Sequence, residues 1–381
     1  MKNLILNAPF NNLSFGNISV NLARELYNKG FACSIFPIGG QVDLSAFDKL
    51  SDPFKKWLED SMHDRLVKIN RDTPTLQMWH INGSETRYSK QKILYSFYEV
   101  NAPTPTEKNL VSLQDHCVFS SKYAADSFKS LGCTNVSHVG PGFDPDFHLT
   151  QKTYLANKIH FGLMGKFEKR KHTAQILKTW AKKYGNNYKY QLSCCITNPF
   201  FQPGQLDGLI HQALEGKRYG NINFLPFLKT NSEVNDYINA IDIELSGLSG
   251  AEGWNLPAFN ATALGKWSIV LNATSHVDWA TPENSILINA SGQTEAYDGA
   301  FFTKGHPFNQ GNIYTLDEEN LIGAMELAET RCGQQNSAGL KLPDQFSYSK
   351  TVDHLITLVK AAGVCSHSPR QKDAARDTVT H

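Results

Sequence analysis

The sequence predicts an α/β protein of two domains, each built on a doubly wound parallel sheet. Its 381 residues exceed the roughly 250–300 residues at which a single hydrophobic core stops growing. Short apolar runs alternate with segments of helical periodicity in two successive series, a pattern typical of parallel sheets covered by helices. Between the two series, around residues 140–157, glycines and prolines interrupt a stretch that has no periodicity.

The first series begins as a βαβ unit. A strand is predicted at 2–8, a helix at 18–30 that ends on a glycine, and a second strand at 32–38. A polar turn containing Gly16 joins the first strand to the helix, as in doubly wound sheets. Further strands are predicted at 76–81, 92–98, 116–121 and 135–140. We therefore expect the first domain to span residues 1–150.

The second series alternates in the same way. Its strands are predicted at 158–165, 188–196, 221–227, 241–247 and 267–273, and its helices at 172–185, 206–217, 232–241 and 256–265. We expect this domain to span residues 151–345. A final helix at 346–365 is expected to pack back on the first domain, followed by a polar tail at 366–381. Substrate should bind between the domains, at the carboxyl ends of both sheets.

The composition argues against several classes of function. Lys plus Arg number 37 against 36 Asp plus Glu, so no net field would attract a nucleic acid or an anionic membrane. No apolar run reaches the roughly 18 residues of a membrane span, and the first residues do not resemble a signal peptide. The cysteines show neither a CxxC pair nor a zinc spacing. We expect a cytoplasmic protein, free or peripheral to a membrane, without a metal site.

A strongly basic turn opens the second domain. After a strand that ends at Gly165 come Lys166, Lys169, Arg170 and Lys171, just before the next helix. A glycine lets the backbone approach a ligand, a helix N-terminus favours an anion, and lysines supply positive charge. The turn therefore fits a diphosphate clamp. From the residues alone, a solvated basic turn is the alternative interpretation.

A second candidate stretch runs from residue 249 to residue 265. It passes from a strand end through a glycine turn into a helix, with Pro257 in the first turn and Gly265 at the end. Glu252 lies in the turn and is expected to face the crevice between the domains. The alternative for Glu252 is a helix cap or a surface carboxylate.

This stretch resembles the signature of the family 4 glycosyltransferases, EGFGLPxxEAMAxGxPV, with EGWNLP at 252–257 and ALG at 263–265. The basic turn matches as well, and weaker matches extend over about the whole chain. The resemblance implies the GT-B fold, in which two Rossmann-like parallel-sheet domains face each other across a cleft. It also implies a retaining transfer of a sugar from a nucleotide-diphosphate sugar to an acceptor hydroxyl, without metal or cofactor.

The resemblance implies roles for individual residues. Gly165, Lys166 and Lys171 would hold the donor diphosphate, Glu252 would orient the sugar hydroxyls, and His80 would reach the donor sugar. The expected catalytic residues are therefore Glu252, Lys166, Lys171 and His80, and Glu99 matches a string that relatives carry on the acceptor side. The expected donor-binding residues are Gly16, Gly165, Lys166, Lys171, Phe227, Glu252, Gly253, Trp254, Asn255, Leu256 and Asn260.

Two positions depart from the family pattern. Asn260 replaces a second glutamate that binds the ribose in relatives, and Asn255 replaces a glycine. An asparagine donates and accepts hydrogen bonds, but a neutral contact is weaker than a charge-assisted one. A degenerate sugar-nucleotide binding protein is therefore an alternative, as is an epimerase or phosphorylase of nucleotide sugars on the same fold. The acceptor, whether glycan, lipid, protein or small molecule, is not specified by these residues.

The string Asp144-Pro145-Asp146 resembles the DxD metal motif of a different glycosyltransferase fold. It lies at the predicted joint between the domains. We therefore expect these two carboxylates to have a structural role.

Overall fold

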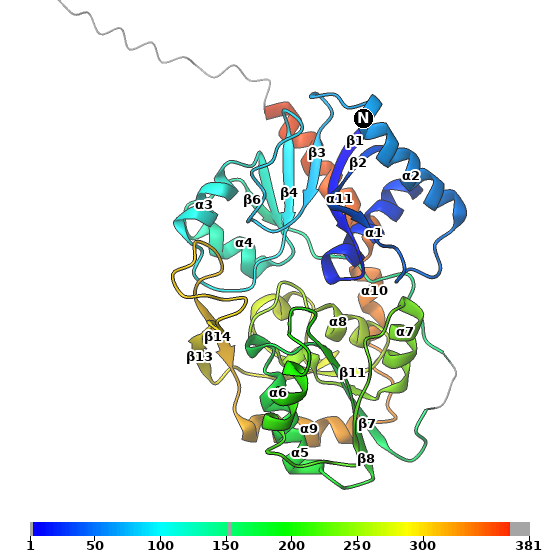
Figure 1. Ribbon diagram of the computed structural model, residues 1–381, viewed down its shortest axis with the longest axis vertical. Coiled ribbons are helices and arrows are strands. Elements are labelled where there is room, and N and C mark those ends of the chain that lie inside the picture. Colours follow the sequence, from blue (N-terminus) through cyan, green and yellow to red (C-terminus); the bar gives the residue numbers. More distant parts are fainter. Residues whose placement is uncertain (1–2, 151–153, 366–381) are drawn as a thin grey trace, which may run out of the picture.

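The computed structural model describes residues 3–150 and 154–365, and these form two lobes, each around a six-stranded parallel sheet (Figure 1). The sheet of the first lobe has the strand order β2-β1-β3-β4-β5-β6. Its strands are β1 (Asn3–Phe10), β2 (Ala32–Val42), β3 (Thr75–Met78), β4 (Lys92–Ser96), β5 (His116–Phe119) and β6 (Val136–His138). Its helices are α1 (Ser14–Asn28), α2 (Asp52–Val67), α3 (Pro105–Ser112) and α4 (Lys122–Lys129).

The sheet of the second lobe has the order β12-β11-β10-β7-β8-β9. Its strands are β7 (Ile159–Lys166), β8 (Tyr190–Thr197), β9 (Ile222–Phe224), β10 (Ile243–Glu244), β11 (Trp267–Leu271) and β12 (Ser285–Ile288). Its helices include α5 (Thr173–Tyr184), α6 (Gln205–Ala213), α7 (Asn231–Ala240), α8 (Leu256–Ala263) and α9 (Glu318–Arg331), with the 3-10 turns η1 (Lys169–Lys171), η2 (Ser246–Leu248) and η3 (Thr274–Asp278). The predicted α/β class with two parallel sheets is confirmed.

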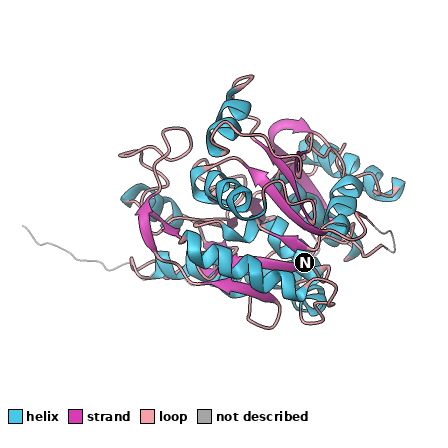
Figure 2. Cartoon of the chain, turned by 90° about the horizontal axis from the view of Figure 1, so that it is seen from below, coloured by secondary structure: helices cyan, strands magenta, loops and turns pink. Residues whose placement is uncertain are grey.

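The central strands are largely buried, as expected where helices cover both faces of a parallel sheet (Figure 2). Every residue of β4 and β11 is buried, as is every residue of β1 after the first. Helix α7 begins at a capping box in which Thr230 accepts from the backbone N–H of Glu233 and the Glu233 carboxylate accepts from that of Thr230. This local signal fixes where α7 starts, and hence where the loop before it ends.

The chain returns to the first lobe at its C-terminal end. After η4 (Gly339–Lys341) and α10 (Leu342–Gln345), helix α11 (Tyr348–Cys365) lies beside α1 in the upper lobe of Figure 1. Its residues Val352, Leu355 and Val359 are part of the core beneath the first sheet. Among the described helices, none is both long enough and apolar enough to cross a membrane.

A second connection joins the lobes on another side, and we call residues 292–315 the arm. Strands β13 (Gly292–Glu295) and β14 (Asn312–Thr315) form an antiparallel hairpin that was not predicted. Phe302 of the arm is buried in the same apolar cluster as Leu94 and Tyr98 of the first lobe. The backbone N–H of Asn309 donates to the Glu107 carboxylate at 2.8 Å. The arm thus ties the second lobe to the core of the first.

Asp144 and Asp146 lie at the joint between the lobes. Asn21 donates to Asp144 at 2.9 Å, Arg24 pairs with Asp146 at 2.9 Å, and Asn231 of the second lobe donates to Asp146 at 2.8 Å. Both carboxylates are buried. Their oxygens accept hydrogen bonds from both lobes, which gives the DPD string a structural role.

Candidate functional site

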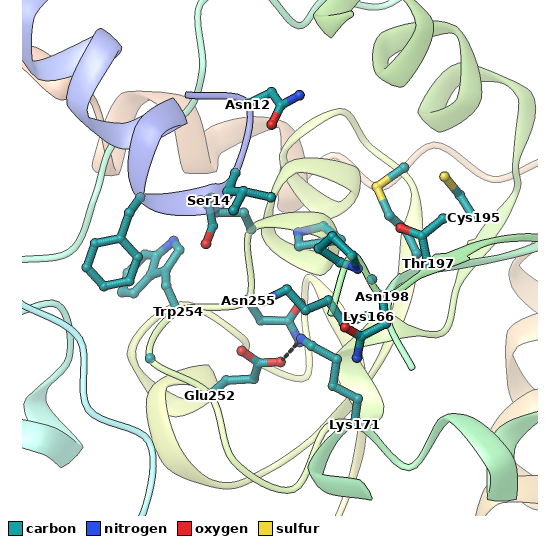
Figure 3. A pocket seen from close by; sticks show the side chains of 18 of the residues that line it. Asn12, Ser14, Lys166, Lys171, Cys195, Thr197, Asn198, Glu252, Trp254 and Asn255 are labelled. Atoms are coloured by element: carbon teal, nitrogen blue, oxygen red, sulfur yellow. Dashed lines mark hydrogen bonds and ion pairs between the residues drawn. The ribbon is translucent and has the colours of Figure 1, made fainter. Parts of the chain in front are cut away.

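A cavity of about 670 Å³ lies between the lobes at the carboxyl ends of both sheets (Figure 3). Loops after parallel strands meet at this edge, which is where doubly wound folds bind ligands. The first lobe contributes residues from the loop after β1 and the loop after β4. The second contributes the end of β7, η1, the loop after β8 and the turn before α8. The polar and charged lining residues are Asn12, Ser14, Glu99, Lys166, Arg170, Lys171, Thr197, Asn198, Glu252 and Asn255.

The basic turn places two lysines in this cavity. Gly165 has φ +139°, and a Cβ added there would lie 3.5 Å from the Lys171 side chain, so Lys171 passes closely over the backbone. Lys166 Nζ lies 4.0 Å from Glu168, and 4.9 Å and 5.7 Å from the ring centres of Phe200 and Phe301. Burial lowers the pKa of Lys166, Glu168 opposes this shift, and Arg170 and Lys171 add to it. The charge of Lys166 is therefore only weakly neutralised by a protein carboxylate.

Glu252 lies at the base of the cavity and is only 5% exposed. Its Oε1 is 2.5 Å from Lys171 Nζ, and its Oε2 is 3.2 Å from Arg170 Nη1. Burial alone would raise the pKa of this carboxyl, but Lys171 and Arg170 outweigh burial and lower it to about 2. The carboxylate is therefore ionised and oriented by two cations of η1.

Asn255 has a backbone conformation that favours glycine. Its φ is +72°, in the left-handed region that asparagine tolerates better than most side chains. Its side chain caps α8 by accepting from the Ala258 N–H at 3.4 Å and donates to the Ser246 carbonyl at 2.8 Å. His276 Nε2 lies 3.0 Å from the same amide nitrogen. Asn255 thus lines the cavity while its amide is held by the protein.

The neighbouring residues connect the turn to the first lobe. The carbonyl of Gly253 accepts from Ser120 at 2.6 Å, and a Cβ on Gly253 would lie 2.9 Å from Phe97. Trp254 lines the cavity but is 2% exposed, and its ring packs on Phe346 with centroids 5.3 Å apart. The turn is therefore built against the first lobe.

Asn260 lies in the first two turns of α8 and lines an adjoining cavity of about 190 Å³ with Asn12 and Ser14. It is 7% exposed, and its Oδ1 has no hydrogen-bond partner among the described residues. Phe227 and Leu256 line the larger cavity, and Phe227 is 43% exposed. These three side chains extend the site away from the basic turn.

Three further candidates have different positions. Gly16 lies in the first turn of α1, where a Cβ would be 2.2 Å from the Asn11 carbonyl oxygen, and it does not line the cavity. His80 does not line it either, but its ring packs on Phe15, which does, at 4.4 Å. Glu99 lines the cavity, 3.5 Å from Arg170 Nη1.

Sequence reasoning missed several residues at the site. In the sequence Arg170 is only one charge of the basic turn, whereas in the structure its guanidinium contacts Glu252. Thr197, the last residue of β8, and Asn198, which follows it, line the cavity, and Asn12 does so after β1. The position of a polar residue at the carboxyl end of a predicted parallel strand is the signal that could have identified them.

No family model and no curated protein matches the sequence. Solved structures do match over nearly the whole chain. Sucrose-phosphate synthase of Thermosynechococcus elongatus has a TM-score of 0.67 at 11% identity, covering 96% of this chain and 100% of its own. HepE of Anabaena, in complex with UDP, has a TM-score of 0.63 at 11% identity, covering 95% and 100%.

A third match is the catalytic domain of starch synthase IV from Arabidopsis thaliana, bound to ADP and acarbose. Its TM-score is 0.61 at 10% identity, and the match covers 96% of this chain and 99% of that one. At such identities the likeness concerns the fold. The chain has two parallel-sheet lobes with a cleft at the carboxyl ends of both sheets, and it matches glycosyltransferase structures over nearly its full length. It therefore has the GT-B fold.

Proposed function

We propose that the protein is a retaining glycosyltransferase that moves a sugar from a nucleotide-diphosphate sugar to an acceptor hydroxyl. The observation that carries this proposal is the grouping of Lys166, Lys171 and Glu252 in one cavity between the lobes. Cations suited to a diphosphate adjoin an ionised carboxylate suited to sugar hydroxyls. Related folds support it, since HepE was solved with UDP-glucose and starch synthase IV with ADP.

The chemical demand of the reaction is to stabilise the departing nucleoside diphosphate. Lys166 and Lys171 neutralise the charge that develops on the phosphate oxygens, a preorganised electrostatic role that needs no metal ion. The N-terminus of α1 adds to this field, because Ser14 lines the cavity and the cap residue Leu13 offers no side-chain acceptor to the first N–H groups.

Glu252 holds the sugar hydroxyls while the acceptor attacks the face from which the diphosphate leaves, so the anomeric configuration is retained. Asn260 offers Oδ1 to a ribose hydroxyl. The turn at Gly253 packs closely on Phe97 of the first lobe, and closure of the lobes over the donor would exclude water, which otherwise competes as acceptor. His80 lies beside this cavity wall, and Glu99 is on the acceptor side.

The first experiment is a thermal-shift screen with UDP-, GDP- and ADP-sugars, because a ligand that binds the folded state raises the unfolding temperature. With the donor it selects, Lys171→Ala should reduce sugar transfer or donor hydrolysis by about 100-fold or more, since a phosphate-stabilising cation is lost. Glu252→Ala should have a comparable effect on turnover. Lys169→Ala is the matched control, because Lys169 belongs to the same turn but donates to the carbonyls of Glu295 and Tyr297.

Wild-type rates in the Lys171 or Glu252 variant would overturn the site assignment. The same assays separate the alternative functions. Sugar epimerisation without any acceptor would identify an epimerase. Release of sugar that depends on phosphate would identify a phosphorylase. Nucleotide binding without turnover of any donor would identify a binding protein.

A further inference from the structure

Arg170 lies in the basic turn, yet its guanidinium is directed at the protein. It is 9% exposed. Its Nε lies 2.7 Å from Glu168 Oε2, while Nη1 lies 2.7 Å from the Ala251 carbonyl oxygen and 3.2 Å from Glu252 Oε2. Burial opposes its charge, but the surrounding carboxylates raise the pKa of Arg170 overall. A guanidinium satisfied by acceptors of the protein is a poor candidate for a phosphate ligand, in contrast to Lys166.

Glu252 depends on Arg170 for its orientation. Its two oxygens face different cations, with Lys171 on Oε1 and Arg170 on Oε2. A phosphate ligand would compete with the Glu252 carboxylate for the Lys171 ammonium, because this one ammonium would then have to bind both anions. Arg170 would remain as the fixed partner of Glu252. The planar guanidinium suits this task better than an ammonium, since its N–H groups have fixed directions.

Arg170 also reaches across the cleft. Its Nη1 lies 3.5 Å from Oε1 of Glu99, which follows β4 in the first lobe. The same loop presses Phe97 against Gly253, so the two contacts form together when the lobes are close. Glu99 is partly exposed, and burial raises the pKa of its carboxyl while Arg170 opposes the rise. The cluster therefore links an acceptor-side residue to Glu252 through one guanidinium.

We propose that Arg170 is a positioning residue that aligns Glu252 when the lobes close, with Glu99 as its anchor on the first lobe. Glu252 acts on the donor sugar only under the proposed function, on which this role of Arg170 therefore rests. The link makes the orientation of Glu252 depend on closure. A donor bound in an open cleft is consequently less prone to hydrolysis than one enclosed with its acceptor.

The test uses the full chain and the variants Arg170→Gln, Arg170→Lys and Glu99→Gln. Binding of the nucleoside diphosphate is measured by calorimetry, and kcat and KM are measured with UDP-, GDP- or ADP-glucose, whichever the screen selects. Arg170→Gln should lower kcat by about tenfold or more and change the Kd of the diphosphate less than about threefold, because Lys166 and Lys171 remain. Arg170→Lys should recover part of kcat, since it keeps the charge but not the fork.

The pH profile gives a readout that a merely structural role would not move. Without Arg170, Glu252 keeps one cation instead of two, so the acid limb of kcat should shift to higher pH. Glu99→Gln, a change of nearly equal size at a partly exposed site, should lower kcat severalfold without weakening diphosphate binding. In the double variant the two losses should not multiply, because both act through one contact.

Lys169→Gln, in the same turn, should leave kcat and Kd unchanged. A wild-type kcat in Glu99→Gln, or a loss of diphosphate binding in Arg170→Gln as large as its loss of kcat, overturns the positioning role. A misfolded Arg170→Gln variant leaves Glu99→Gln to decide. Failure of the wild-type chain to bind any nucleotide is a different result, since it refutes the proposed function itself and the role of Arg170 with it.

Discussion

At the scale of single residues, Asn255 combines a strained backbone with two hydrogen bonds. Its φ of +72° disfavours a side chain, but its amide caps α8 and donates to Ser246. Asn255→Ala should lower the free energy of unfolding by about 2 to 3 kcal/mol, because the cap is lost and the backbone strain remains. Asn255→Gly should cost only about 1 kcal/mol, since glycine removes the strain.

Urea denaturation of the two variants measures this difference. Equal losses in the alanine and glycine variants would show that the left-handed backbone at position 255 does not favour glycine over alanine.

Asn260 makes a separate prediction about the donor. Its buried Oδ1 has no partner among the described residues, and the residue lines the smaller cavity. Asn260→Ala should weaken nucleoside diphosphate binding by about 2- to 12-fold, the value of one neutral hydrogen bond of about 0.5 to 1.5 kcal/mol. Calorimetry measures the Kd, with the exposed Asn289→Ala as control. An unchanged Kd in Asn260→Ala would remove Asn260 from the ribose site.

At the scale of elements, the basic turn shows what a sequence can and cannot predict. The strand ending at Gly165 and the helix after Lys171 follow from periodicity, so a cationic loop at the sheet edge was predictable. The different directions in which its cationic side chains point were not predictable. Lys169 donates to carbonyls of the arm, Arg170 turns toward Glu252, and Lys166 lies beside two phenylalanine rings. A 3-10 turn and distant partners decide these directions, and neither leaves a local signal.

The arm is the element that sequence patterns could not show. All four residues of β13 are exposed, so the strand lacks the apolar run that predicts β-structure. The loop between β13 and β14 contacts the first lobe. Phe302 is the centre of these contacts and is 5% exposed.

Phe302→Ala should therefore destabilise the connection between the lobes. The loss of a buried phenylalanine costs about 3 kcal/mol, as for large-to-small core substitutions. Scanning calorimetry should show a lower unfolding temperature and a partial separation into two transitions. Lys304→Ala in the same loop removes an exposed ion pair with Glu295 and a contact with the Tyr297 ring, both at the surface, and should change little. An unchanged thermogram for Phe302→Ala would mean that the arm does not couple the lobes.

At the scale of the whole molecule, the two parallel sheets were predictable because strands covered on both faces are apolar throughout. The contacts that join the lobes were harder to predict, since they use single polar residues far apart in the chain. Asn21 and Asn231 both donate to the Asp144–Asp146 string, and Ser120 donates to Gly253. These contacts, together with α11 and the arm, join the two lobes, and residues of both lobes line the cleft between them.

Two buried histidines make the stability of the whole chain depend on pH. Burial lowers the pKa of His172 to about 4, and burial likewise lowers that of His276 to about 4 despite the nearby Glu252. Between about pH 6.5 and pH 4, the unfolded chain binds protons at these positions and the folded chain does not. Stability should therefore fall as the pH drops through this window, on the order of 3 kcal/mol for each histidine by pH 4.

Carboxyl groups whose pKa is raised act in the opposite sense, and Asp144, raised by burial to about 6, is the clearest case. The difference between variants therefore isolates the histidines better than the total curve does. His276→Gln should lower stability at neutral pH, because the hydrogen bond to Leu271 is weakened, and should flatten the fall between pH 6.5 and pH 4. The exposed His63→Gln should leave the curve unchanged. Urea denaturation at several pH values measures both, and parallel curves for wild type and His276→Gln would show that His276 does not carry the acid sensitivity.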